Sequence, residues 1–323
     1  MKTMTWLIRR EFWEHKGMFF WAPLVVSAAL TLFLSATMMY AAGKHGLPTR
    51  VTVDGTVQTV PQIVAAMTVD DKIKLSDALV AGAMLVSGPI FVMLCVTLFF
   101  YCLGAMFDER RDRSILFWKS LPVSDSMTVA SKVATALLLA PLITFAFAFV
   151  TSFVLTLVAC SVAAWAGLNV FGLVLGNGDL YLAPLRMLAT LPVYILWALP
   201  TVGWLVMVSS WARSKVFLWA VGAPLLALGI VKWANHLYQL NIDVDWIAHN
   251  VLARGLLGLV PGIWFPLEQV PSAMLVSDHA VSIGSVFTQS WMTMASPSAW
   301  IGGAVGVAML AVAVRLRRWR DEG

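Results

Sequence analysis

The sequence predicts an all-α integral membrane protein with six transmembrane helices, folded as one transmembrane domain over residues 1–323. Its residues are 60% hydrophobic and 12% charged, with a mean hydropathy of +0.82. A soluble domain carries about 25% charged residues, so the polar side chains here are too few to cover a surface in water. The second observation is a series of long uncharged runs, and the third is that basic residues gather at the ends of these runs.

The uncharged runs set the number of spans, because a helix needs about 20 apolar residues to cross the hydrocarbon core. The predicted spans are 18–42, 78–107, 133–165, 187–212, 216–232 and 297–314. The first run exceeds the roughly 7–15 residues of a signal-peptide core, so we expect it to be retained as a membrane span.

The segment 233–296 is predicted to be an external loop with short helices. Its apolar run 255–267 lies between Arg254 and Glu268 and is interrupted by Pro261 and Pro266. Because the run is too short to span, an interfacial or a re-entrant piece is the expected structure. Arg254 and Lys232 are then expected on the external side.

The orientation follows from the basic residues, which concentrate in alternate connections and in both termini. The four groups are Lys2, Arg9, Arg10 and Lys16; Arg110, Arg111, Arg113, Lys119 and Lys132; Arg213 and Lys215; and Arg315, Arg317, Arg318 and Arg320. By the positive-inside rule, the N- and C-termini are both expected in the cytoplasm.

Residues 1–17 are predicted to form an interfacial helix. On a helical wheel, Met4, Leu7, Ile8 and Phe12 share an apolar arc, which Glu11 and His15 interrupt. Tryptophan and basic side chains suit a helix that lies at the membrane surface. The expected interfacial anchors are Trp6, Arg9, Arg10 and Trp13. A basic segment that only sets the orientation is the alternative.

Residues 108–122 are predicted to form an amphipathic helix between the second and third spans. Its apolar side carries Ile115, Phe117, Trp118 and Leu121, and its other side is mostly charged. Pro122 ends this helix, and Ser124 or Asp125 can cap the next one. Such a surface suits the docking of a soluble partner; the alternative is a helix that rests on lipid headgroups.

Three features in order resemble the ABC-2 type permeases, the membrane subunits of ATP-binding-cassette exporters. They are REFWEHKGMFFWAP before the first span, FDERRDRSILFWKSLPVSDSMTVASK between the second and third spans, and the spacing of six helices up to the Arg-rich end. The resemblance implies that residues 1–17 are a connecting helix and 108–122 a coupling helix seated in an ATPase. The coupling surface that it implies consists of Glu109, Arg110, Arg113, Ser114, Phe117, Trp118 and Pro122.

The resemblance also implies the partners and the compartment. ATP and Mg belong to a separate ABC ATPase subunit, and the chain pairs with a second permease copy or a related permease. The expected site is a bacterial cytoplasmic (inner) membrane, where the complex exports a substrate. Short helices on the outer side between the last two spans would match residues 250–276. The long first external loop, 43–77, departs from the family pattern.

The residues themselves exclude several other functions. The Gly43-Lys44 pair lacks the remaining P-loop residues, so no cofactor site is expected in this chain. His236, His249 and His279 lack metal-ligand spacing, and no paired acids lie within the predicted spans, so an enzyme is not expected. The basic residues lie at the ends of apolar runs and do not form a basic face interleaved with aromatic residues, which is the pattern expected of a nucleic-acid-binding protein.

The predicted spans contain almost no charged residues, which disfavours a proton- or sodium-driven transporter. The substrate then has no evident counter-charge, and this slightly favours a hydrophobic or amphipathic cargo. Asp179 and Arg186 flank the fourth span and are expected to anchor it. The alternative function is a non-transporting membrane anchor or assembly factor.

Overall fold

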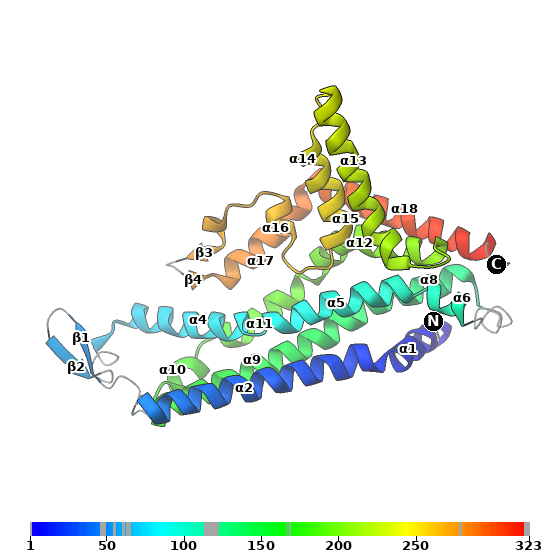
Figure 1. The fold of residues 1–323 in the computed structure, drawn as a ribbon. Helices are drawn as coiled ribbons and strands as arrows, with labels where there is room; N and C mark the ends of the chain where they lie inside the picture. Colours follow the sequence, from blue (N-terminus) through cyan, green and yellow to red (C-terminus); the bar gives the residue numbers. More distant parts are fainter. Residues whose placement is uncertain are drawn as a thin grey trace.

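The computed structural model shows an elongated helical bundle with both termini at one end (Figure 1). It describes residues 2–45, 50–53, 56–59, 62, 66–112, 123–165, 167, 169–277 and 280–319. Within these ranges, six helical segments are long and apolar enough to cross a membrane, which confirms the predicted all-α fold class. They are Gly17–Lys44, Val69–Arg111, Asp125–Trp165, Asp179–Trp211, Leu218–Tyr238 and Pro297–Trp319.

Most of these segments extend beyond the predicted spans, and in two of them a polar cap lets the helix begin in more polar sequence. α4 (Val69–Leu85) starts at a capping box between Thr68 and Asp71, with the Asp71 amide 3.2 Å from the Thr68 hydroxyl. α8 (Asp125–Ala134) starts at Ser124, whose hydroxyl accepts a hydrogen bond from the Met127 amide at 3.3 Å. Hydropathy alone finds the apolar core of a helix and not its capped ends.

Three spans contain a π-helical turn just before a proline. Gly17–Trp21 precedes Pro23 in α2 (Ala22–His45), Thr135–Leu139 precedes Pro141 in α9 (Ala140–Trp165), and Leu218–Gly222 precedes Pro224 in α13 (Ala223–Tyr238). A proline ring clashes with the carbonyl four residues earlier and removes one backbone donor. A wider turn at that position lets the helix continue instead of breaking.

The end that carries the termini, called here the termini end, is built from four elements. α1 (Lys2–Glu14) packs beside α8, while α6 (Phe107–Arg111) follows α5 (Gly88–Gly104) after a short turn. The last helix, α18 (Pro297–Trp319), reaches the same end, as Figure 1 shows. Chain segments far apart in the sequence therefore meet here.

The opposite end carries shorter elements that join the spans. A hairpin of β1 (Arg50–Val53) and β2 (Thr56–Thr59), α10 (Phe171–Leu175) and α11 (Asp179–Ala189) lie there. In α11, Arg186 Nη1 and Asp179 Oδ1 are 3.0 Å apart, so these two residues pair with each other.

The bundle centres on α12 (Leu191–Trp211), which packs most extensively against α18. Trp197, Val202 and Leu205 on α12 are fully buried and belong to one core with Leu94 and Leu98 of α5. In Figure 1, α13 diverges from this bundle, and none of its residues is buried.

The chain between α13 and α18 consists of short pieces, the first of which pack against α13. They are α14 (Val244–Ile247), a π-helical turn (Ala248–Ala253), α15 (Arg254–Leu257), α16 (Trp264–Leu267), a 3-10 turn (Ser272–Met274), the hairpin β3 (Val276–Ser277) and β4 (Ala280–Val281), α17 (Ile283–Met292) and a second 3-10 turn (Thr293–Ala295). Leu259 and Trp264 lie in the main core, so the turn after α15 enters the bundle.

Residues 258–263, called here the entering turn, and the end of α15 have backbone groups that accept hydrogen bonds from, or donate them to, side chains of α5 and α12. The Thr201 hydroxyl donates to the Arg254 carbonyl and accepts from the Gly258 amide, both at 3.0 Å. The Leu259 carbonyl accepts from the Tyr194 hydroxyl at 3.3 Å and from the Cys95 thiol at 3.2 Å. Non-helical backbone is tolerated at membrane depth only when protein groups satisfy it in this way, and this favours the re-entrant interpretation.

Candidate functional site

Five buried or partly buried charged side chains form an ion-pair cluster at the termini end. Glu11 comes from α1, Glu109 from α6, Asp125 and Lys132 from α8, and Arg317 from α18. Except for Asp125, their side chains are at most 6% exposed. All five residues lie outside the predicted spans, in the segments expected to flank them, so the expectation of almost no charged residues inside those spans is unaffected.

Lys132 is the central cation of this cluster. Its Nζ lies 3.0 Å from Glu11 Oε1 and 3.1 Å from Glu109 Oε1. The second oxygen of Glu11 accepts a hydrogen bond from the Tyr101 hydroxyl at 3.0 Å. One ammonium group thus joins α1 to α6 and α8.

Arg317 is the second cation and connects both flanks of the 108–122 segment to α18. Its Nη1 lies 2.7 Å from Glu109 Oε2 and its Nε lies 3.1 Å from Asp125 Oδ1, so it contacts the chain both before and after residues 113–122. Arg10 Nη2 is 3.8 Å from Glu109 Oε1. Counting Arg10, three cations face three carboxylates, so the cluster is close to neutral.

This balance matters because an isolated buried charge is costly, and the net gain from a buried pair is small. Loss of one partner is severe, since it leaves the other charge without compensation. The cluster is therefore a rigid junction whose members depend on one another.

The four predicted interfacial anchors differ in their exposure. Trp6 and Trp13 are 51% and 57% exposed, and Arg9 is also exposed. The Arg10 side chain is only 12% exposed and pairs with Glu14 at 3.2 Å. The face of α1 that carries Leu7 and Glu11 is buried against the protein, so Glu11 marks a protein-facing position and not a flaw in a lipid-facing arc.

Two residues of the predicted coupling surface are engaged inside the protein. The Glu109 side chain is 6% exposed and belongs to the ion-pair cluster. Arg110 Nη2 donates to the carbonyls of Ala212, at 2.9 Å, and Ser209, and so holds the end of α12. The remaining residues of that surface, and most of the predicted helix, lie outside the described residues: Arg113, Ser114, Phe117, Trp118 and Pro122.

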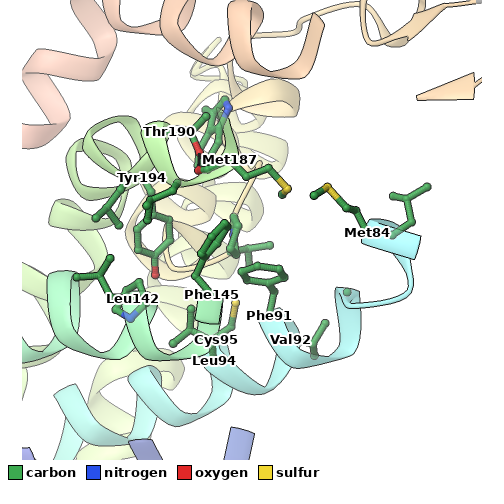
Figure 2. A pocket seen from close by; sticks show the side chains of 18 of the residues that line it. Met84, Phe91, Val92, Leu94, Cys95, Leu142, Phe145, Met187, Thr190 and Tyr194 are labelled. Carbon is green, nitrogen blue, oxygen red and sulfur yellow. Dashed lines mark hydrogen bonds between the residues drawn. The ribbon is translucent and has the colours of Figure 1, made fainter. Parts of the chain in front are cut away.

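A cavity of about 430 Å³ lies among α4, α5, α9, α11, α12 and the entering turn. Figure 2 shows side chains that line it, among them Phe91, Phe145 and Tyr194. Its polar wall groups are already paired: Tyr194 and Cys95 donate to Leu259, and Thr190 donates to Met187 at 2.7 Å. Because these polar hydrogens already bond to protein carbonyls, the wall of the cavity is suited to binding a hydrocarbon chain.

A larger side chain at Gly88 can test whether hydrocarbon enters this cavity. Gly88 lines the wall, and a methyl group at this position meets nothing within 4 Å. We expect Gly88→Leu to reduce photo-crosslinking of a diazirine-tailed phosphatidylcholine to Phe91 and Phe145 at least fivefold. Crosslinking to the exposed Phe33 provides the internal reference.

Gly82→Leu is the matched control, since Gly82 is equally open but does not line the cavity. Unchanged labelling of Phe91 and Phe145 in Gly88→Leu would show that hydrocarbon does not enter the cavity.

The described residues contain no group of three or more His, Cys, Asp or Glu side chains that could hold a metal ion. Cys95, Cys102 and Cys160 are free thiols. The ion-pair cluster and the apolar cavity are thus the features around which a function can be argued. Comparisons of the chain with protein-family models, with curated proteins and with solved structures found no match.

Proposed function

We propose that the chain is the permease subunit of an ABC-2 type exporter in a bacterial cytoplasmic membrane. A separate ABC ATPase subunit, carrying ATP and Mg, drives the export, and this chain is not an enzyme by itself. The observation that carries the proposal is the ion-pair cluster, which joins α1, the start of the 108–122 segment in α6, the start of α8 and α18.

This arrangement suits a coupling role. Movement of the 108–122 segment toward the membrane would be passed to α18 through Arg317 and to α1 through Lys132. The free energy of ATP can shift the membrane part only through contacts that differ between two states. A neutral, buried junction at the base of the segment transmits such a shift better than a flexible linker.

The proposed orientation is supported by the way basic segments gather. Arg110 contacts the end of α12 next to Arg213, Lys132 contacts α1, and Arg317 contacts α6 and α8. Four basic segments that are distant in sequence therefore belong to the termini end. By the positive-inside rule, this clustering supports a cytoplasmic location for the termini end.

The proposed partner in the membrane is a second permease copy or a related permease. It would cover α13, where Leu225, Leu226, Ile230 and Trp233 are exposed and no residue is buried. The hydrocarbon-lined cavity supports a hydrophobic or amphipathic cargo.

The test is co-expression of the chain with candidate neighbouring ATPases, followed by purification in nanodiscs. We expect one ATPase to co-purify with the chain. The double variant Phe117→Ala, Trp118→Ala is expected to reduce the amount of co-purified ATPase at least tenfold, because it removes two aromatic anchors of the proposed docking helix. Retained ATPase protein and ATPase activity are the two readouts.

The matched control is Phe33→Ala, Tyr40→Ala, which removes two exposed aromatic residues from α2. A chain that purifies as a folded protein while every candidate ATPase fails to bind would overturn the proposal. That result would favour the membrane anchor or assembly factor.

A further inference from the structure

Arg254 is a buried cation that the sequence placed in an external loop. It begins α15 and is 8% exposed. Its guanidinium carbon lies 4.5 Å from the centre of the Trp197 ring, and its Nη2 donates to the Ala299 carbonyl at 3.2 Å. The guanidinium fits beside α18 because residue 302 is glycine, and a methyl group at that position would overlap the guanidinium.

Within the described part of the chain, the Arg254 charge is balanced only at a distance, by Glu268. Arg254 forms no ion pair with any residue in the described ranges, and its Nε is buried without a hydrogen-bond partner among them. Glu268, the acid that acts on it electrostatically, accepts hydrogen bonds from Ser296 at 2.9 Å and from Ser298. An arginine has five N–H donors, so most of its capacity remains unused.

The position of Arg254 along the bundle makes this imbalance significant. Gly302, which the guanidinium touches, lies roughly 22 Å along α18 from Arg317 of the ion-pair cluster, at 1.5 Å per residue. The hydrocarbon core of a bilayer is about 30 Å thick. An ionisable side chain at such depth is expensive, and it usually marks a binding or transport function.

A second cavity, of about 420 Å³, borders Arg254 between α12, α13, the returning segment α14–α15 and α18. Its wall is mainly apolar and includes Trp204, Leu256, Ile301 and Val305. The polar wall residues Asn250 and Ser298 donate to Trp246 and Glu268, and the charged donor at this cavity is Arg254.

We propose that this cavity binds the oxyanion head group, carboxylate or phosphate, of an amphipathic molecule, with Arg254 as its counter-ion. The planar guanidinium suits the two oxygens of such a head group, and the apolar wall accepts the hydrocarbon tail. As an identification of the cargo class this inference rests on the proposed export function, whereas binding itself needs no ATPase.

The test is native mass spectrometry of the full chain released from a neutral detergent, with four probes that share a C12 tail. The probes are dodecyl phosphate, dodecanoate, dodecanol and dodecyltrimethylammonium. We expect the two anions to bind the wild type at least tenfold more tightly than the alcohol or the cation. Comparison of the two anions shows whether phosphate or carboxylate is preferred.

Arg254→Met is expected to weaken binding of both anions at least tenfold, and Arg254→Lys is expected to restore part of it. Lys232→Met is the matched control, because it removes a positive charge from an exposed position on neighbouring α13. Equal binding of anionic and cationic probes, or undiminished anion binding by folded Arg254→Met, would overturn the proposal.

If Arg254→Met does not fold, Val305→Phe decides the question, since it narrows the cavity and leaves Arg254 in place. A tenfold loss of anion binding in that variant supports the site, and unchanged binding overturns it. Anion binding by a chain that recruits no ATPase would keep this site while removing the export function.

Discussion

Replacing Lys132 by methionine is expected to lower the free energy of unfolding by about 3–5 kcal/mol, as measured by SDS titration in mixed micelles. Methionine keeps the length of the side chain but removes the charge that lies 3.0 Å from Glu11 and 3.1 Å from Glu109. Glu11 then loses its cation partner at 3.0 Å, while Glu109 keeps its pairs with Arg317 and Arg10.

The control for this change is Lys74→Met, which removes a lysine from an exposed pair with Asp70 on α4. We expect it to change the free energy of unfolding by less than about 0.5 kcal/mol. The double variant Glu11→Gln, Lys132→Met is expected to recover part of the loss, because it no longer buries the Glu11 charge. If Lys132→Met is no less stable than Lys74→Met, the cluster is solvated in solution and cannot be a rigid junction.

The sequence predicted the number, order and approximate positions of the spans, because lipid selects long apolar helices whatever their tertiary contacts. It also predicted a cap at Ser124 and the short pieces between the last two spans, since both depend on local chemistry. Most helices extend beyond the predicted spans, as capped ends such as Thr68 carry no hydropathy signal.

The ion-pair cluster was missed because its members lie far apart in sequence. Lys132 pairs with Glu11 at a separation of 121 residues, and Arg317 pairs with Glu109 at a separation of 208 residues. Pattern analysis of one sequence cannot pair such positions. One usable signal was present: Glu11 lies within the apolar arc of α1, and a carboxylate on a packed face requires a buried partner.

Arg254 was misplaced for a related reason. It precedes an apolar run that is too short to span the membrane, and a charged residue at such a position is predicted to lie in a loop outside the membrane. Burial of Arg254 depends on the Trp197 ring and on the space at Gly302, both of which belong to other helices. A re-entrant segment brings its flanking charges into the bundle, whereas an interfacial segment leaves them at the surface.

Replacing Gly306 by valine is expected to destabilise the protein by about 3 kcal/mol, at the upper end of the usual cost of overpacking. A side chain at Gly306 would meet the Leu199 carbonyl at 2.5 Å, and one at Gly203 would meet the Gly306 carbonyl at 2.5 Å. These contacts are with backbone, so rotamer changes cannot relieve them. α12 and α18 would have to move apart.

The Gly302–Gly306 spacing matches the small-residue pattern that lets membrane helices approach closely. Since lipid supplies no hydrophobic force between helices, close packing of this kind is what holds α18 on α12. Gly229→Val on exposed α13 is the control, because a side chain there meets nothing within 4 Å, and a change of at most about 0.5 kcal/mol is expected. Equal stabilities of Gly306→Val and Gly229→Val would mean that α12 and α18 do not pack as closely as the structure shows. Anion binding at Arg254 should fall together with stability in Gly306→Val, because α12 and α18 carry Trp197 and Gly302 on either side of the guanidinium.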